Sequence, residues 1–239
     1  MYPEKLERQE EKYIARFGEH PVLAGLGDMR NTDLEQMLLQ RSVFSLEYFE
    51  PFYNTAIRAV VNEEGKKIAR GIVTEEYRGE ENPNHREDAV TDLKLIGIDE
   101  GIILTTEMTD CTKIALALLR QLVTFTDKDS KNRKLYDVRA LTALRFGGEV
   151  MAGEEYALLC PELQRRYDLT PEKSVFYWPH RGHDQKKKKF GEKGSSHADR
   201  FGEILVEIID SPEALEVAMR TIKDSFVART RFYDQFSKC

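Results

Sequence analysis

The chain has 239 residues, a formal net charge of −6 and a pI near 5.6, and 41% of its residues are hydrophobic. This composition is ordinary for a soluble globular protein. The acidic balance disfavours nucleic acid as a partner, because phosphate binding needs a basic face. No apolar run approaches the ~20 residues of a membrane span, and the three cysteines form no CxxC pair. We therefore expect a cytoplasmic protein with a single domain over residues 1–239.

Helical spacing of apolar residues dominates the chain, and the period-2 alternation of strands is scarce. A first helix is expected from about residue 3 to residue 17, and a second one after Asn31, which can cap it. Pro51 is expected to kink or break the second helix. Further along, one helix ends at Glu76 and the next begins at His85, on either side of the loop YRGEENPN.

The second half of the chain also reads as helical. Residues 109–125 are apolar around most of a helix, which predicts a buried helix. Another helix is expected over residues 134–159, with an interruption at the glycine pair 147–148. Residues 170–172, Thr-Pro-Glu, are typical of a helix start with proline at the first position, so a helix is expected from there through His180. The sequence thus predicts an all-α fold.

Several acids and histidines lie beside the expected core. Glu75 and Glu76 both end an amphipathic helix near its apolar face, and the sequence leaves the choice between them open. Glu149 lies in the apolar run ALRFGGEVMA, where a charge is costly unless it is paired. His180 and Asp184 are four residues apart, so on a helix they share a face and can bind one metal ion. Inward-pointing carboxylates and imidazoles of this kind form dinuclear iron sites in helical bundles.

In order and spacing, these residues resemble the haem-oxygenase-like diiron oxidases and oxygenases, whose seven-helix fold is shared with haem oxygenase and thiaminase-type proteins. Members of that family carry a Glu near a helix end, a short Gly-containing loop and a His that opens the next helix. The segment EEYRGEENPNH fits this pattern with Glu76 and His85. A second Glu, matched by Glu149, and an aromatic-rich segment with the pattern His-x3-Asp-x2-His, matched by His180 and Asp184, follow in the family's order.

The chain departs from the family at the last histidine of that pattern, which would fall on a lysine. We interpret residues 185–196 as an insert that breaks the motif helix, with His197 as the last ligand. Two alternatives stay open: Asp184 belongs to the insert and the site lacks its Asp, or His183 is a substitute ligand. Glu50 matches an early Glu that some members add. The ligands implied by the resemblance are therefore Glu50, Glu76, His85, Glu149, His180, Asp184 and His197.

The resemblance implies a non-haem diiron oxidoreductase with two Fe(II) ions and O2 as co-substrate. The expected substrate is a small carboxylate-bearing molecule, first of all a free amino acid, and the expected reactions are desaturation, C–H functionalisation or C–C cleavage. Arg145, one helical turn before Glu149, is expected to bind the substrate carboxylate through two parallel hydrogen bonds. Arg139 is the second choice for this role, and the alternative for Arg145 is a buried ion pair with Glu149 or another acid. An external electron donor and the homodimer frequent in the family are left open.

Two other functions compete with this one. The first is a metal-free thiaminase-type hydrolase of the same fold, for which Cys111 or Cys160 would supply the nucleophile. The second is a non-enzymatic helical interaction protein, in which the acids lie on the surface and the histidines have no shared role. Iron content after anaerobic reconstitution separates the diiron hypothesis from these two, and activity on thiamine-like pyrimidines would favour the hydrolase.

Overall fold

Helices make up all regular secondary structure in the part of the chain that the computed structural model describes, which is residues 2–76, 85–184 and 186–237. The side chains of residues 46–48, 50 and 85 are outside this description. The all-α prediction is confirmed, with twelve α-helical segments in these residues where seven helices were expected. In chain order the elements are α1 (Tyr2–Gly18), α2 (Pro21–Ala24), η1 (Leu26–Asp28), α3 (Asn31–Ala59), α4 (Glu63–Glu76), α5 (His85–Leu95), α6 (Glu100–Thr105), α7 (Asp110–Val123), η2 (Asp129–Lys131), α8 (Arg133–Thr142), η3 (Ala143–Val150), α9 (Met151–Tyr167), α10 (Tyr177–Asp184), α11 (His197–Ile208) and α12 (Pro212–Asp234).

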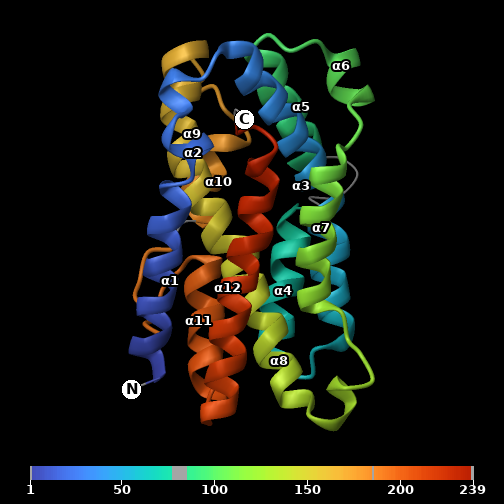
Figure 1. Cartoon of the computed structure of the whole chain (residues 1–239), viewed down its shortest axis with the longest axis vertical. Coiled ribbons are helices and arrows are strands. Elements are labelled where there is room, and N and C mark those ends of the chain that lie inside the picture. The colour runs from blue at the N-terminus through green and yellow to red at the C-terminus, as the bar shows by residue number, and fades with distance from the viewer. Residues whose placement is uncertain (1, 77–84, 185, 238–239) are drawn as a thin grey trace.

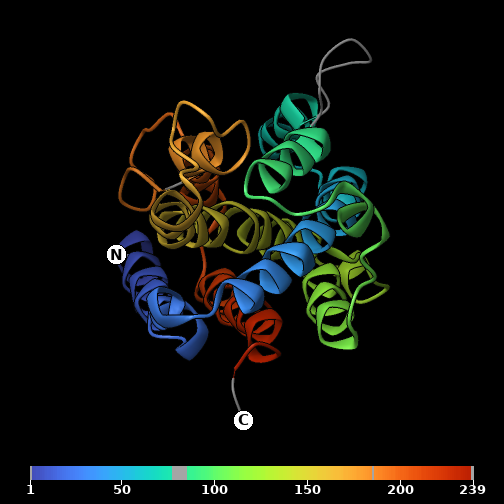
Figure 2. The ribbon, with the colours of Figure 1, turned by 90° about the horizontal axis from the view of Figure 1, so that it is seen from above.

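A continuous helical run of α8, η3 and α9 crosses the middle of the molecule, and the other long helices surround it (Figures 1 and 2). All eight residues of η3 are buried, and α3, α7, α11 and α12 pack against this element. Apolar side chains from all of these helices form one hydrophobic core cluster. Among the described residues, no helix is long and apolar enough to cross a membrane.

The glycine pair lies in the part of this central run that departs from a regular α-helix. η3 is π-helical, so the interruption expected at residues 147–148 is a widened turn rather than a break. A Cβ atom on Gly147 would lie 3.1 Å from Oγ of Ser225 on α12. A Cβ atom on Gly148 would lie 2.6 Å from the hydroxyl of Tyr53 on α3. The two glycines therefore permit close approach of two neighbouring helices, at the kind of π-bulge that is frequent near functional sites.

Of the kink or break expected at Pro51, the break does not occur, because α3 continues through this proline to Ala59 as one element. Proline removes one backbone hydrogen bond and crowds the preceding turn. The following turns are nevertheless fixed by packing, since Phe52, Tyr53 and Ala56 are all buried in the core. Tertiary burial here outweighs the local preference of a single residue.

The helix start expected at residues 170–172 is also wrong, because α10 begins at Tyr177. The group that caps α10 comes from a different helix. The carboxylate of Asp92, on α5, accepts hydrogen bonds from the backbone N–H groups of Val175 at 2.9 Å and of Phe176 and Tyr177 at 3.0 Å. These bonds satisfy donors that a helix start leaves unpaired. A carboxylate so distant in sequence gives no local signal for this start.

Candidate metal centre

Four elements bring carboxylates and imidazoles to one place beside the central helical run. Glu76 is the last residue of α4, Glu149 lies in η3, His180 and Asp184 lie in α10, and His197 opens α11. Glu149, His180, Asp184 and His197 are all buried. The end of α4, the π-helical turn, α10 and the start of α11 therefore meet there, and five of the seven predicted ligands form one contiguous cluster in the folded chain.

The histidines and glutamates of this cluster face one another in pairs. Nδ1 of His197 lies 3.1 Å from Oε2 of Glu149, and Nε2 of His197 lies 2.9 Å from Oε2 of Glu75. Nε2 of His180 lies 3.7 Å from Oε1 of Glu76. The sequence left the choice between Glu75 and Glu76 open, and the structure places both at the cluster, each beside a different histidine.

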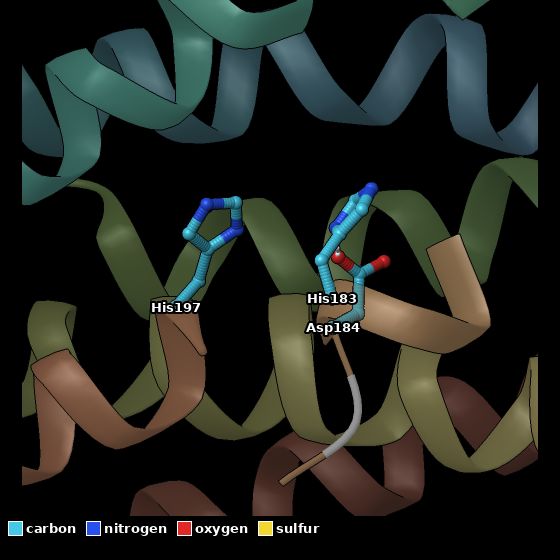
Figure 3. A group of neighbouring side chains, drawn as sticks. All are labelled: His183, Asp184 and His197. Carbon is cyan, nitrogen blue, oxygen red and sulfur yellow. Dashed lines mark hydrogen bonds and ion pairs between the residues drawn. The ribbon is translucent and has the colours of Figure 1, made fainter. Parts of the chain in front are cut away.

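A second group of ligand atoms joins the cluster from the end of α10. One ligand atom each of His183, Asp184 and His197 lie within 4.8 Å of one another, and the three side chains project in the same direction from α10 and α11 (Figure 3). Nδ1 of His183 is 2.5 Å from Oδ1 of Asp184, and the His183 ring lies 4.9 Å from that of His180. Asp184 therefore ends α10 at the site and does not belong to the insert. His183, kept open as a substitute ligand, is there as well.

Neighbouring groups orient two of these side chains. The hydroxyl of Tyr53, on α3, donates a hydrogen bond to Oε1 of Glu149. Nδ1 of His180 lies 2.7 Å from the backbone carbonyl of Phe176, which leaves Nε2 directed at Glu76. Histidines that bind metals usually donate their other ring N–H to such a carbonyl. Tyr53 was not predicted from the sequence, because it lies 96 residues from Glu149 in the chain and no local pattern marks it.

The carboxylates change the acidity of the imidazoles. Burial alone would lower the pKa of His197, but the hydrogen bond and charge of Glu149, with the charges of Asp184 and Glu75, outweigh it and raise this pKa to about 9. Burial acts in the same way on His180, whose pKa is nonetheless raised by its bond to Glu76 and by Asp184. Metal binding displaces protons from such ligands. Four carboxylates and three imidazoles are a donor set that fits iron.

The other predicted site residues have different outcomes. The side chains of Glu50 and His85 lie outside the described residues, so their place at the site stays a prediction. Arg145 is 1% exposed, and its guanidinium makes two 2.9 Å hydrogen bonds to Glu10 and a third to the carbonyl of Ala198. The alternative of a buried ion pair is therefore what the structure shows, with Glu10 as the acid. The substrate-binding role expected for Arg145 loses its support.

Comparison with known proteins identifies the fold. No protein-family model matches the chain, and no curated protein matches it in sequence. The solved structures that resemble it include a domain of unknown function with a haem-oxygenase-like fold from Shewanella denitrificans OS217 (18% identity, TM-score 0.67, covering 97% of this chain and 90% of that one), a TenA family transcription regulator from Silicibacter sp. TM1040 (16%, 0.64, 99% and 96%) and a CADD-like protein of unknown function from Nostoc punctiforme PCC 73102 (14%, 0.71, 98% and 96%). The predicted haem-oxygenase-like fold is confirmed, and at these identities the likeness concerns the fold alone.

Proposed function

We propose that this chain is a non-haem diiron oxidoreductase that uses O2 to oxidise a small organic molecule. One observation carries the proposal. Carboxylates and imidazoles from α4, η3, α10 and α11 converge in pairs, with nitrogen-to-oxygen distances between 2.5 and 3.7 Å. Carboxylates can bridge two metal ions, and neutral imidazoles suit iron as terminal ligands. When bound, iron supplies the reaction with O2 that no amino acid side chain provides.

The residues of the chain divide into ligands and groups that shape the site. The ligands would be Glu76, Glu149, His180, Asp184 and His197, with Glu75 and His183 as two more donors beside them. The Tyr53 hydroxyl holds one oxygen of Glu149 and leaves the other facing His197. The side chains of Glu75 and His183 are 58% and 43% exposed, whereas those of Glu149 and Asp184 are 5% and 9% exposed. A small molecule would therefore approach from the side of Glu75 and His183.

The proposed substrate is a small carboxylate-bearing molecule, with free amino acids as the first class to test. Arg145 is held by Glu10 in the core, so we do not assign the substrate carboxylate to this arginine. Positive charge for that carboxylate would come from the metal ions themselves, since hard cations favour oxygen donors. The reaction also needs electrons, from the substrate or from an external donor.

The thiaminase-type alternative needs a cysteine nucleophile, and Cys160 is poorly suited to this role. Cys160 is fully buried, and burial raises the pKa of its thiol to about 12, with the charge of Arg181 lowering it and that of Asp92 raising it. A thiol with such a pKa stays protonated near neutral pH and is a weak nucleophile. Cys111 is half-buried at the start of α7. Hydrolysis of a thiamine-like pyrimidine by iron-free protein would favour this alternative.

The proposal is tested by anaerobic loading with Fe(II), metal analysis, and O2 consumption across a panel of amino acids and fatty acids. We expect about two irons per chain, as a dinuclear centre requires, and substrate-dependent O2 uptake. The variant Glu149→Gln should lose both. Arg166→Gln, far from the cluster in a network of its own, is the matched control and should keep both. Iron binding that survives loss of Glu149, or O2 uptake without iron, would contradict the proposal.

A further inference from the structure

The segment 186–196, which we call the strap, joins α10 to α11 and so connects two proposed ligands. It is fastened to α1 at two points. Nζ of Lys186 lies 2.7 Å from Oε1 of Glu7 and 3.3 Å from Oε2 of Glu10. The backbone N–H of Phe190 donates to Oε2 of Glu7 at 2.6 Å, and its ring is 5% exposed. The strap is the orange segment that runs beside α1 in Figure 1.

Arg145 connects this strap to the central helical run and to α11. Two of its nitrogens bind both oxygens of Glu10 at 2.9 Å. The guanidinium carbon lies 4.8 Å from the centre of the Phe190 ring. A further N–H donates to the carbonyl of Ala198, the residue that follows His197. One buried arginine thus touches α1, the strap and the first turn of α11, with the planar geometry that suits a bidentate carboxylate and an aromatic face.

Close packing holds the strap against α11. Gly191 has a φ of 81°, in the left-handed region that favours glycine, and a Cβ atom there would clash with the side chain of Val206. A Cβ atom on Gly194 would clash with the carboxylate of Asp199. The same carboxylate accepts a hydrogen bond from the backbone N–H of Lys188 at 3.2 Å. The strap therefore has a defined seat on the helix that carries His197.

We infer that Arg145 is a positioning residue for the metal centre: it fixes the strap through its contacts with Glu10 and with the Phe190 ring, and so sets the separation of Asp184 and His197. The reason is geometric. An extended chain advances ~3.3–3.6 Å per residue, so a loose segment of the strap's length permits many separations of the two helix ends. Anchoring the strap to α1 and α11 restricts the two helix ends to one separation. Groups that orient ligands in this way typically change metal affinity 10–100-fold when they are removed. The inference rests on the proposed function.

The test is Arg145→Gln, compared with Arg229→Gln as a matched control. Both arginines are buried, at 1% and 2% exposure, and each substitution leaves the partner acid with a second cation. Glu10 keeps Lys186, and Glu155 keeps Arg41. The measurements are amide hydrogen exchange over residues 186–199, the rate of iron loss to a chelator, and the thermal midpoint.

For Arg145→Gln we expect faster exchange in the strap and iron loss that is about 10–100-fold faster. The control should lower the thermal midpoint but leave both other readouts unchanged. Lys186→Gln keeps the bond between Arg145 and Glu10, so it should shift both readouts in the same direction by less. If Arg145→Gln does not fold, the inference is tested with Lys186→Gln alone. This variant must then accelerate both amide exchange in the strap and iron loss.

The outcomes separate this inference from the proposed function. Wild-type protein that binds no iron overturns the proposed function, and the inference falls with it. Wild-type protein that binds iron, with a folded Arg145→Gln variant that retains it equally well, overturns the inference only. Faster amide exchange in the strap without faster iron loss also overturns the inference only, because it shows that the strap does not position the ligands.

Discussion

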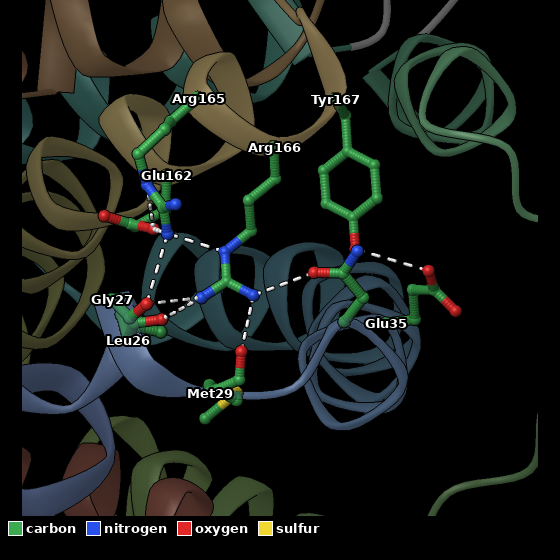
Figure 4. A network of polar contacts seen from close by, with 9 residues as sticks. Leu26, Gly27, Met29, Glu35, Glu162, Arg165, Arg166 and Tyr167 are labelled. Atoms are coloured by element: carbon green, nitrogen blue, oxygen red, sulfur yellow. Dashed lines mark hydrogen bonds and ion pairs between the residues drawn. The ribbon is translucent and has the colours of Figure 1, made fainter.

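Two polar regions of the molecule use charge in opposite ways. The first surrounds Arg166 near the end of α9 (Figure 4), where the guanidinium makes five hydrogen bonds. Its acceptors are the Glu162 carboxylate, the Asn31 side chain and the carbonyls of Leu26, Gly27 and Met29. Every N–H of this side chain has a partner, so the network is complete and joins η1 to α9.

The second region is the candidate metal centre, where Glu75, Glu76, Glu149 and Asp184 each face an imidazole. The raised pKa values of His197 and His180 mean that these two imidazoles hold protons more tightly than usual, and protons can be exchanged for metal ions. A permanent cation cannot be exchanged in this way, because arginine stays charged at all accessible pH values. The Arg166 network therefore has the character of a structural network, whereas the cluster has the exchangeable charge that the proposed metal site requires.

The largest expected effect is the loss of iron affinity in the variant Glu149→Gln, which should keep the fold. Glu149→Gln keeps the shape of the side chain but removes the charge that faces His197. We expect iron affinity to fall on the order of 1,000-fold, above the 10–100-fold typical of groups outside the ligand set. Isothermal titration under anaerobic conditions measures it. Wild-type affinity in this variant would show that Glu149 is not a ligand.

The reverse experiment breaks the Arg166 network. Arg166→Ala leaves the Glu162 carboxylate and several carbonyls without their donor, and bonds to charged groups contribute about 1.5–3 kcal/mol each when a buried partner is lost. We expect a loss of about 3 kcal/mol in the free energy of unfolding, measured with urea, and unchanged iron affinity. An equal loss of iron binding would mean that the two regions are coupled.

These two regions also show how far the sequence could lead. Helical periodicity predicts the all-α fold, and the order and spacing of the motif residues point to Glu149, His180 and Asp184. The predictions that were wrong concern the start of α10 and the role of Arg145, and both depend on contacts between distant segments. The Asp92 carboxylate, on α5, caps the start of α10. Arg145 forms an ion pair with Glu10 instead of facing the site where its spacing from Glu149 predicted a substrate carboxylate. Neither partner is marked by a local pattern.

His197 makes the stability of the metal-free protein depend on pH. The pKa of His197 is about 9 in the fold, above its ordinary value of 6.5. A raised pKa means that the folded state holds the proton more tightly. The resulting stability is fully present below pH 6.5 and is lost as pH rises through 9. We expect on the order of 2–3 kcal/mol from this group. Urea unfolding of chelator-treated protein at low and high pH measures it, and His197→Asn should flatten the dependence.

The smallest expected effect concerns Tyr53, which touches the proposed ligand set without belonging to it. Its hydroxyl donates to Glu149, and its ring stacks on Phe49 at 4.5 Å, so Tyr53→Phe removes the hydrogen bond and keeps the packing. One oxygen of Glu149 would then lose its fixed donor while the other still faces His197, and we expect iron affinity to fall about tenfold, the lower end for orienting groups. The matched control is Tyr136→Phe.

Tyr136 is equally buried, and its hydroxyl donates to the carbonyl of Val123 at 2.8 Å, away from the cluster. Both variants lose one buried hydrogen bond, so both should lose about 1 kcal/mol of stability. Only Tyr53→Phe should weaken iron binding. The substitution Gly148→Ala sharpens the comparison. Its Cβ atom would lie 2.6 Å from the Tyr53 hydroxyl, so it would displace this hydroxyl from Glu149 without removing it from the protein. If iron affinity is the same in all three variants, Tyr53 supports the fold and does not orient Glu149.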